Sequence, residues 1–410
     1  MADLLSQLNK MKTSRERLLV LSFAKRNRIV AEIAKMLVRY QKEVLKANRR
    51  DVDSLKRTEL KDRLELNLKR LLDIAQSAKR VAKLPDPLHK ILEEKILSNG
   101  LCLQKLSVPL GTLSVIYESR PNVTVDLAVL AIKSGNALVL KGGSEAYNTN
   151  KILVKIIQQA LKCHHLPLNL IYLITPKDEW KEVLLNAHGL IDVLIPRGGE
   201  ELIQWVRENS KIPIIETGAG VCHTLVDADC NIDTAVKIII NAKTQRPSVC
   251  NALDTLVIHQ TSAKKLLPAL AAPLAKWGVE IFADADSYHL LKKLYLSEFL
   301  QKAKPEHYGK EFLSLKISIK VVKDFEEGIK FVKKHTSGHS EAILSRDVDP
   351  INKFLTEIDA AVVYANASTR FTDGGEFGMG AEVGVSTQKL HARGPMGLES
   401  LTSYKWIVKG

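Results

Sequence analysis

Short apolar runs rich in β-prone residues alternate with helical segments from about Thr112 onward, and this alternation constrains the fold more than any other feature. A short run without polar alternation predicts a strand buried on both faces. When helices separate such strands, the pattern predicts a parallel sheet with helices on both sides. The first series predicts strands at Leu113–Tyr117, Ala137–Leu140, Leu170–Ile174, Ile191–Ile195 and Ile212–Ile215, with helices such as Asn150–Lys162 and Lys177–Ala187 between them.

A second alternating series follows and predicts a second α/β lobe. The chain of 410 residues is long enough for more than one domain. A parallel sheet binds ligands beyond the carboxyl ends of its strands, so polar loops that follow strands are candidate sites. The second series predicts strands at Thr224–Val226, Thr255–Ile258, Val279–Ala283, Leu315–Val322, Glu341–Leu344 and Ala360–Tyr364, and helices at Ile232–Lys243, Ala263–Lys276 and Phe325–His335.

The first 95 residues are predicted to be helical and carry most of the positive charge. One apolar stripe runs from Ile29 to Val44, another from Leu64 to Ala75, and Pro85 and Pro87 end the helical pattern. This region has 24 Lys/Arg against 13 Asp/Glu, within a net charge of +14 for the chain. The charges are spread around helices and do not cluster with aromatic residues. We therefore expect solvated helix faces that attract anionic substrates, and no nucleic-acid partner.

Two segments predict a small β element outside the two lobes. Extended runs at Lys95–Leu97 and Leu101–Leu106 flank Asn99-Gly100, a dipeptide that strongly favours a hairpin turn. Near the C-terminus, Leu401–Val408 also has the pattern of a strand.

Composition excludes several classes of protein. No apolar run reaches the ~20 residues that a membrane-spanning helix needs. The N-terminus lacks the apolar segment of a secretion signal. Five cysteines, an odd and sparse set, favour reduced thiols in the cytoplasm. No zinc-binding motif is present, so no metal site is expected.

Two glycine-rich loops follow predicted strands and precede predicted helices. They are Lys141-Gly142-Gly143-Ser144-Glu145 and Arg197-Gly198-Gly199. Such loops present backbone N–H groups and a helix N-terminus to an anion, although a plain structural turn is an equally good interpretation of each. Two of them on one sheet favour a dinucleotide, and the basic residues favour a 2′-phosphate, hence NADP(H) over NAD(H).

Cys250 lies on a polar, proline-containing loop and is the candidate nucleophile. Loops on rigid scaffolds carry function disproportionately, and the nearby Lys243 and Arg246 would favour the reactive thiolate. Cys222 stands beside His223, so a Cys/His pair is a weaker alternative that lacks an orienting residue. The other three cysteines lie in or beside predicted elements.

Two further segments contain candidate ligand-binding residues. Asn122 follows a strand, where its amide could donate to an oxyanion or simply cap the next helix. The loop Gly374–Gly384 is unusually rich in glycine and can approach a ligand closely, although it is also compatible with a flexible surface loop. Within it, Glu376 could hold ribose hydroxyls and Phe377 could pack near a nicotinamide.

Together these segments resemble the gamma-glutamyl phosphate reductases of the aldehyde dehydrogenase superfamily. The resemblance implies an α/β fold with a Rossmann-type cofactor lobe, an α/β catalytic lobe and a small β oligomerisation arm. Its implied boundaries are 1–223 for the cofactor domain with arm hairpin 95–107, 224–362 for the catalytic domain, 363–385 for a return to the cofactor domain, and 386–410 for the arm and C-terminal strand. The matching segments are Glu118–Asp126, Lys141–Ala146, Ile195–Gly199, Arg246–His259 and Glu376–Trp406.

The same resemblance implies roles for individual residues. Cys250 matches the nucleophile, and Asn122 matches the amide of the oxyanion hole. Lys141 matches the lysine at the adenosine ribose or its 2′-phosphate, while Glu376 and Phe377 match the pair that holds the nicotinamide ribose and ring. The implied reaction is NADPH-dependent reduction of L-glutamate 5-phosphate to L-glutamate 5-semialdehyde and phosphate, through a thioester on Cys250.

Substrate contacts, the fate of the thioester and the partners are further expectations. Arg120, Arg246, Ser248 and Glu216 are candidate substrate-binding residues. Glu216 precedes Cys250 by 34 residues, a placement that resembles the general base of hydrolytic aldehyde dehydrogenases. The alternative function is therefore an NAD(P)-dependent aldehyde dehydrogenase that hydrolyses the thioester. We expect a homodimer or a homotetramer, with handover of the labile substrate from glutamate 5-kinase.

Overall fold

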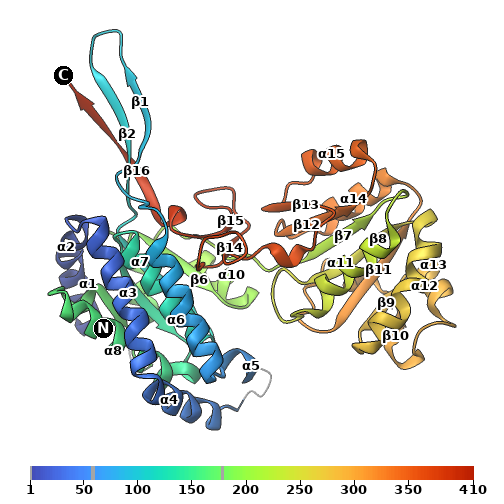
Figure 1. Cartoon of the computed structure of the whole chain (residues 1–410), viewed down its shortest axis with the longest axis horizontal. Helices are drawn as coiled ribbons and strands as arrows, with labels where there is room; N and C mark the ends of the chain where they lie inside the picture. Colours follow the sequence, from blue (N-terminus) through green and yellow to red (C-terminus); the bar gives the residue numbers. More distant parts are fainter. Residues whose placement is uncertain (1, 57–60, 177–179) are drawn as a thin grey trace. The chain divides into compact units, whose positions relative to one another are not determined.

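The computed structural model describes residues 2–56, 61–176 and 180–410, and the chain forms two compact units (Figure 1). The first unit contains the chain up to Thr217 and the segments Gly374–Gly384 and Leu390–Gly410. The second unit contains Gly218–Asp373 and Val385–Lys389. Both units are α/β, as the alternating pattern predicts.

The first unit is built on a four-stranded parallel sheet with the order β5-β4-β3-β6. From β3 the chain moves outward through β4 to β5, and β6 then pairs on the other side of β3. This order places a topological switch point between β3 and β6, where α/β sheets bind ligands. The strands are β3 (Thr112–Tyr117), β4 (Ala137–Gly142), β5 (Ile171–Leu173) and β6 (Val193–Arg197).

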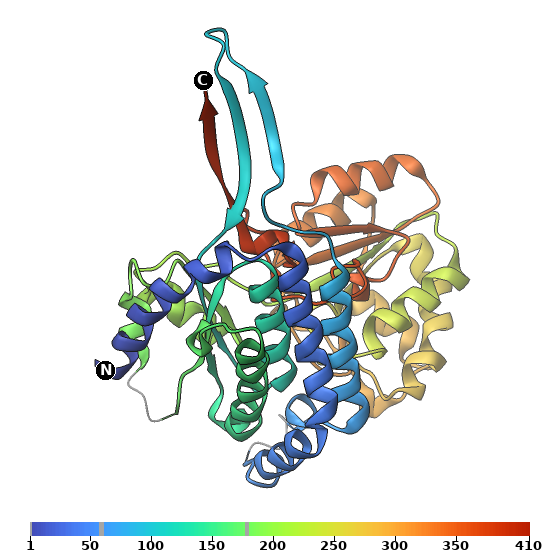
Figure 2. The same ribbon diagram turned by 60° about the vertical axis from the view of Figure 1, so that its left-hand side comes forward.

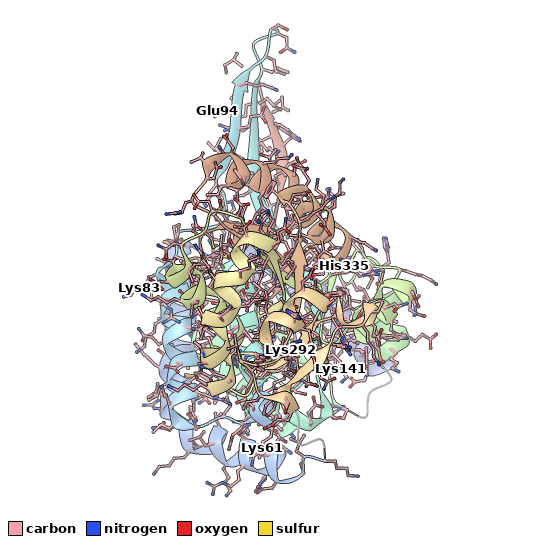
Figure 3. All side chains as sticks on the ribbon, turned by 90° about the vertical axis from the view of Figure 1, so that its right-hand side faces the viewer. Lys61, Lys83, Glu94, Lys141, Lys292 and His335 are labelled. Carbon is pink, nitrogen blue, oxygen red and sulfur yellow. The ribbon has the colours of Figure 1, made fainter. Side chains whose placement is uncertain are left out.

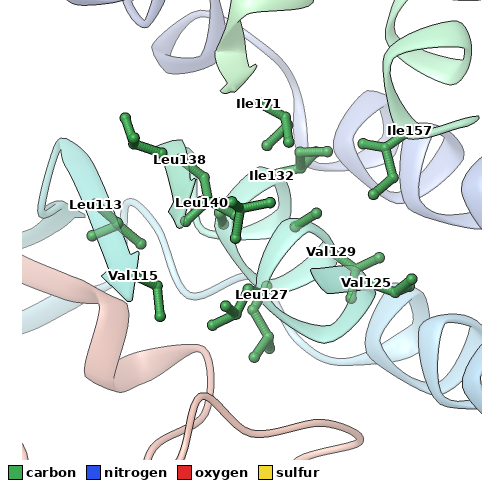
Figure 4. Close-up of a cluster of buried hydrophobic side chains, with 14 of the residues drawn as sticks. Leu113, Val115, Val125, Leu127, Val129, Ile132, Leu138, Leu140, Ile157 and Ile171 are labelled. Atoms are coloured by element: carbon green, nitrogen blue, oxygen red, sulfur yellow. The ribbon is translucent and has the colours of Figure 1, made fainter. Parts of the chain in front are cut away.

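The core of the first unit lies between this sheet and its helices. Figure 4 shows leucine and valine side chains of β3 and β4 facing those of α7, with Ile157 of α8 and Ile171 of β5 beside them. All six residues of β3 are buried, as expected for a strand that is covered on both faces. The helices, seen from two sides in Figures 1 and 2, are α1 (Ala2–Ser14), α2 (Glu16–Leu19), α3 (Phe23–Arg39), α4 (Gln41–Asp53), α5 (Lys61–Leu64), α6 (Leu68–Lys83), α7 (Pro121–Lys133), α8 (Tyr147–Cys163), α9 (Trp180–Asn186) and α10 (Glu200–Asn209).

The N-terminal helices agree with the apolar stripes except in two respects. The stripe from Ile29 to Val44 spans two helices, because α3 ends at Arg39 and α4 begins at Gln41. In α6 the buried residues are Leu71, Ile74, Ala75, Ala78, Val81 and Ala82. Leu68 and Leu72, which the sequence places on the apolar face, are exposed, because the buried face of α6 turns away from them.

The predicted hairpin and C-terminal strand form one three-stranded antiparallel sheet, here called the arm. It consists of β1 (Ile91–Ile96), β2 (Cys102–Pro109) and β16 (Thr402–Lys409), with β2 in the centre. The predicted hairpin is confirmed, and Gly100 in its turn has a φ of 86°. The arm projects from the helices of its unit in Figures 1 and 2, and Glu94 marks its projecting part in Figure 3.

The second unit is built on a seven-stranded parallel sheet with the order β10-β9-β11-β8-β7-β12-β13. Its strands are β7 (Cys222–Val226), β8 (Leu253–His259), β9 (Glu280–Ala283), β10 (Leu300–Lys302), β11 (Lys316–Val322), β12 (Ser340–Leu344) and β13 (Val362–Ala365). Its helices are α11 (Ile232–Thr244), α12 (Gln260–Lys276), α13 (Ala285–Leu291), α14 (Phe325–His335) and α15 (Val348–Glu357). The short strands β14 (Val385–Ser386) and β15 (Gly394–Pro395) follow near the C-terminus.

Two predicted elements differ from the structure, and some observed elements, such as β10, were not predicted. Ile212–Ile215 is not a strand but makes a single bridge from Ile214 to Leu194, because Pro213 has no N–H to continue a ladder. Strand β10 has no counterpart in the prediction; it has three residues, two of them exposed. Of the helix expected at Lys177–Ala187, residues 177–179 lie outside the described residues, and α9 covers Trp180–Asn186.

The contacts also divide the chain at positions other than the expected domain boundaries. The second unit begins at Gly218, not at 224, because Gly220 and Val221 bond to Glu311 and Ser337 within it. It continues to Asp373, not 362, because β13 runs to Ala365 and the residues after it bond to the loop before β8. The segment 385–389 also groups with the second unit rather than with the first.

Among the described residues, no helix has the length and the apolar character needed to cross a membrane.

Candidate active site

Cys250 lies on the loop between α11 and β8, at the amino edge of the second unit's sheet. Its side chain is half-buried, whereas Arg246 on the same loop is exposed and Ser248 is half-buried. Helix α11 ends at Thr244 and β8 begins at Leu253, close to the predicted positions. The loop therefore brings these three predicted residues together on one short segment with a rigid element at each end.

Gly220, before β7, and Cys222, in β7, hold the main chain of Cys250, a role that the sequence pattern indicates for neither of them. Gly220 packs so closely that a Cβ there would lie 1.6 Å from the Cys250 carbonyl oxygen. The buried Cys222 thiol donates to the same oxygen at 3.3 Å. Burial, with smaller contributions from nearby carboxylates, raises the pKa of the Cys222 thiol well above its usual value. Cys222 is thus a neutral hydrogen-bond donor in this structure and not a nucleophile.

The weaker alternative of a Cys222–His223 pair is wrong. Successive residues of a strand point to opposite faces of the sheet. His223 Nδ1 lies 3.2 Å from both carboxylate oxygens of Glu341, and the imidazole nearest to the Cys222 sulfur is that of His339, at 4.0 Å.

The structure gives Lys243 a role other than the one that its sequence position suggests. Its ammonium group is buried and donates to the carbonyls of Ser314 at 3.1 Å and Lys316 at 2.8 Å, with Asp254 at 3.8 Å. Burial lowers the pKa of Lys243 and raises that of Asp254 to about 6, and each group partly offsets the shift of the other. A buried ammonium group needs such partners, so Lys243 anchors the chain at the start of β11.

In the first unit, Arg120 and Asn122 stand at the carboxyl end of β3, where α7 begins. Arg120 occupies the N-cap position of α7 and Pro121 the first helical position. Asn122 is inside the first turn, so the alternative that Asn122 caps this helix is wrong. Its amide nitrogen donates to Asp126 Oδ2 at 3.2 Å, one turn along the helix. An amide has two hydrogens, so one of them remains for an acceptor beyond the strand end.

The loop from Lys141 to Glu145 follows β4 at the same edge. Both glycines are closely packed: a Cβ on Gly142 would lie 2.4 Å from Asn150 Nδ2, and one on Gly143 would lie 2.2 Å from Glu145 Oε1. The Lys141 ammonium donates to the Gly142 carbonyl at 2.9 Å and lies 5.1 Å from the centre of the Trp180 ring. Burial lowers the pKa of Lys141, while the nearby Glu145 partly offsets this shift. Figure 3 labels Lys141.

Two carboxylates tie this edge of the sheet together. Glu145 accepts from Ser119 N at 2.9 Å, and also from the Ser119 hydroxyl. Glu118 accepts from Gly199 N at 3.1 Å, at the N-terminus of α10. A helix N-terminus after a glycine loop is a typical phosphate site, so a ligand phosphate there would have to displace Glu118.

The switch point offers one unused donor that fits an anionic ligand. Arg197 Nη1 is buried and has no hydrogen-bond partner among the described residues. A buried guanidinium nitrogen without a partner is costly, so a bound anion would stabilise it. Lys141 and Arg197, with the backbone of the Lys141–Glu145 loop, therefore place donors suited to a dinucleotide phosphate at this edge. The described residues contain no cluster of His, Cys, Asp and Glu that could hold a metal ion.

Glu216 lies just before the end of the first unit and is held by α10. The guanidinium of Arg207 donates to both carboxylate oxygens, through Nε at 2.7 Å to Oε1 and through Nη2 to Oε2. This hydrogen bond, together with the charge of Glu216, raises the pKa of Arg207. A carboxylate that already accepts two charge-assisted bonds is better suited to a structural role than to abstracting a proton from water.

The loop Gly374–Gly384 returns the chain to the first unit and packs against α6. Ser77 donates to the Gly380 carbonyl at 2.8 Å, and Gly374 N donates to Glu382 Oε2 at 2.8 Å. Between these anchors Glu376 and Phe377 form an exposed turn. The loop is therefore closed by an internal hydrogen bond and held against α6, which argues against the alternative of a flexible surface loop, and its two candidate residues are exposed.

Comparisons with known proteins match the chain to oxidoreductases. Residues 6–287 match the model of the aldehyde dehydrogenase family. A protein of Pelodictyon phaeoclathratiforme named gamma-glutamyl phosphate reductase is 50% identical over 385 residues, which cover 94% of this chain and 92% of that protein. One of the same name from Legionella pneumophila strain Paris is 48% identical over 409 residues, covering 100% of this chain and 98% of its own.

Solved structures give the same result. The crystal structure of gamma-glutamyl phosphate reductase from Thermotoga maritima aligns with a TM-score of 0.93 and 42% identity, covering 99% of this chain and 98% of that one. A propionaldehyde dehydrogenase from Rhodopseudomonas palustris aligns with a TM-score of 0.72 at 17% identity, covering 98% of this chain and 96% of its own, and shares the fold.

Proposed function

Because this chain belongs to the gamma-glutamyl phosphate reductases, a group of oxidoreductases within the aldehyde dehydrogenase family, we propose that it reduces L-glutamate 5-phosphate to L-glutamate 5-semialdehyde. Phosphate is released, and the product serves proline synthesis. One observation carries this proposal. The identity of about one half to proteins of that name extends over almost the whole chain, including both units and the arm. A shared fold alone would not produce it.

Cys250 is the proposed nucleophile. Its thiolate attacks the acyl carbon of the substrate, the C–S bond forms, and the C–O bond to phosphate breaks with the electron pair leaving on phosphate. The product of this step is a thioester on Cys250. Gly220 and Cys222 support the step by fixing the Cys250 carbonyl, so that the loop keeps one conformation during the attack.

Asn122 and the backbone N–H of Cys250 are the proposed oxyanion donors. Negative charge develops on the acyl oxygen in each tetrahedral transition state, and a fixed amide donor stabilises it without reorganisation. The bond from Asn122 to Asp126 orients the amide group and leaves its second hydrogen for the oxyanion.

The cofactor is proposed to be NADPH, which when bound supplies the hydride that converts the thioester to a hemithioacetal. The hemithioacetal then breaks its C–S bond, which returns the Cys250 thiolate and releases the aldehyde. The preference for NADPH rests on Lys141 and on the unpartnered Arg197 donor. The residues proposed to hold the cofactor are Lys141, Gly142, Gly143, Ser144, Glu145, Arg197, Gly198, Gly199, Glu376 and Phe377.

Arg120, Arg246 and Ser248 are the proposed contacts for the substrate phosphate and α-carboxylate. An exposed guanidinium such as that of Arg246 can meet either anion with two parallel hydrogen bonds. Arg246→Ala is expected to raise the KM for glutamate 5-phosphate, and an unchanged KM would remove Arg246 from this role.

Hydrolysis of the thioester by Glu216 is the alternative function. It is less favoured, because both Glu216 oxygens accept hydrogen bonds from Arg207 and because attack of water on the thioester would consume the activated acyl group before its reduction. Glu216 is proposed to be a structural carboxylate that supports the carboxyl end of β6.

The reverse reaction separates the two functions. Glutamate 5-semialdehyde and NADP+ are supplied with and without inorganic phosphate, and NADPH formation is followed by its absorbance. The proposal expects phosphate-dependent formation that Cys250→Ser abolishes and Glu216→Gln retains. Formation that needs no phosphate and is lost in Glu216→Gln would instead show a hydrolytic aldehyde dehydrogenase.

The proposed setting is the cytoplasm, because a nucleophilic thiol has to stay reduced. The arm is proposed to join copies of the chain into a homodimer or homotetramer. Its outer strands β1 and β16 leave unpaired edges, and it exposes apolar residues, among them Ile96, Trp406 and Val408. Handover from glutamate 5-kinase is proposed because an acyl phosphate is labile in water.

A further inference from the structure

Asn251, the residue after Cys250, is bonded through its side chain and its main chain to a segment far away in the sequence. Asn251 is only 4% exposed. Its amide nitrogen donates to the carbonyls of Thr372 at 2.8 Å and Arg370 at 3.3 Å, and its amide oxygen accepts from Arg370 Nη1. Its main-chain carbonyl accepts from the Thr369 hydroxyl at 2.8 Å. All of these contacts join the Cys250 loop to residues 369–372, which we call the latch.

The latch leads directly into the glycine-rich loop. The chain leaves the second unit at Asp373 and enters the first unit at Gly374. Thr372 precedes Glu376, the candidate ribose-binding residue, by only four residues. The Thr372 side chain is also fixed, since its hydroxyl lies 2.6 Å from Ser340 Oγ and 2.8 Å from Tyr364 Oη. One end of the connection to Glu376 is therefore held by the residue next to Cys250.

We propose that Asn251 is a positioning residue that couples the Cys250 loop to the cofactor-binding loop through the latch. The proposal rests on the proposed function, because it takes Cys250 as the nucleophile and Glu376 as a cofactor contact. With Asn251 in place, the Cys250 loop and the start of the glycine-rich loop are held against the same buried network. Without the Asn251 side chain, the Cys250 loop and the start of the glycine-rich loop are released together. Neither Cys250 nor Glu376 then keeps its position.

Packing alone does not account for this arrangement. An apolar residue of similar size at position 251 would fill the same space, but it would leave the Thr372 carbonyl without its amide donor. The four hydrogen bonds of Asn251 all reach the same four-residue segment, 118 to 121 positions away in the sequence. A residue that only filled the core would contact several elements and would not single out the connection to the cofactor loop.

The test compares Asn251→Ala with Asn366→Gly in the full-length enzyme. Asn366 is a matched control on the opposite edge of the same sheet, where its side chain makes two hydrogen bonds with the main chain of Ser345. Its φ of 54° suits glycine, so the control removes those bonds without backbone strain. Three quantities are measured for each variant: kcat and KM, NADP+ affinity by fluorescence titration, and thermal stability.

For Asn251→Ala the proposal expects a fall in kcat of about 100-fold, since a displacement of about 1 Å can cost this much. It also expects NADP+ affinity to fall about tenfold, while KM for glutamate 5-phosphate changes less than threefold. Asn366→Gly should lower thermal stability and leave both kcat and NADP+ affinity within twofold of wild type. If either quantity stays at the wild-type value in Asn251→Ala, the coupling is refuted.

A milder variant covers the case in which Asn251→Ala does not fold. Thr369→Val removes only the hydroxyl that donates to the Asn251 carbonyl. It should lower both quantities in the same direction by about threefold, and wild-type values for either would again overturn the proposal. Cys250→Ser separates this inference from the proposed function. Should Cys250→Ser remain active, the proposed function fails, whereas an inactive Cys250→Ser beside a wild-type-like Asn251→Ala refutes only the coupling.

Discussion

A methyl group added at Gly220 should displace the candidate nucleophile Cys250. A Cβ at this residue would lie 1.6 Å from the Cys250 carbonyl oxygen and 2.8 Å from the Cys250 Cβ. Real Cβ atoms essentially never approach a heavy atom more closely than 3.0 Å. The Cys250 carbonyl must therefore move by about 1.4 Å in Gly220→Ala, because the atom in the way is backbone and cannot rotate aside.

The size of the effect follows from this displacement. A misplacement of about 1 Å in a reacting group can lower a rate by about 100-fold, which corresponds to about 2.7 kcal/mol of activation free energy. The same movement breaks the hydrogen bond from the Cys222 thiol to the Cys250 carbonyl. Forcing a methyl group into a packed interior also destabilises the fold by about 1–3 kcal/mol. Gly220→Ala is thus expected to lose at least about 100-fold in kcat/KM.

The assay is the phosphate-dependent reverse reaction, with activity expressed per folded enzyme and the folded fraction taken from urea unfolding. Gly278→Ala is the matched control, because Gly278 lies in the same unit and a Cβ there would meet nothing within 4 Å. Its φ of 63° makes alanine cost about 1–2 kcal/mol in stability without touching Cys250. The control should therefore lose stability and keep its kcat/KM.

A kcat/KM for Gly220→Ala within twofold of wild type would refute the reasoning. It would mean either that the Cys250 loop moves without consequence or that Cys250 does not carry the reaction.

Three further predictions concern other parts of the chain. Asn122→Ala should lower kcat by about 100- to 1,000-fold, as removal of an oxyanion donor does, with little change in melting temperature; a change below threefold would exclude that role. Burial lowers the pKa of His339 to about 4 from the value of 6.5 expected for the unfolded chain. The folded state is therefore at full stability above about pH 6.5 and loses stability as the pH falls toward 4, because only the unfolded chain then binds the proton. Urea unfolding should show about 2 kcal/mol of this loss between pH 7 and pH 5, and His339→Asn should lack it; an unchanged pH slope in the variant would contradict the assignment. Deleting residues 402–410 removes β16 from the arm, and sedimentation should then show dissociation of the proposed oligomer; an oligomer of unchanged size would exclude β16 from the interface.

Local patterns in the sequence were sufficient for most of the architecture. The unbroken apolar run Leu113–Tyr117 became the wholly buried strand β3, and Asn99-Gly100 became the turn of the arm hairpin. These features depend on neighbours within a few residues, so the sequence expresses them directly. The failures have local causes too, because Pro213 interrupts a run that otherwise looks like a strand.

Site residues were predicted only where the residue type and its position in the sequence indicate a chemical role. Cys250, Asn122 and the two glycine-rich loops stand out by residue type and by their position after or before a strand. Asn251 and Gly220 carry no such signal, since asparagine and glycine are common in loops. Glu118 also went unassigned, and only its contact with Gly199 shows that a carboxylate already occupies the N-terminus of α10.

The sequence by itself determined the alternation of strands and helices, the separation into two α/β units and the thiol on the loop before β8. The tertiary structure alone decided which residues hold that thiol's backbone in place. Gly220 packs against the Cys250 carbonyl, Cys222 donates to it, and Thr369 donates to the carbonyl of the next residue. These three residues lie between 28 and 119 positions from Cys250 in the sequence. Hydrophobic period and turn chemistry act over a few residues, whereas such contacts form only when distant segments pack together.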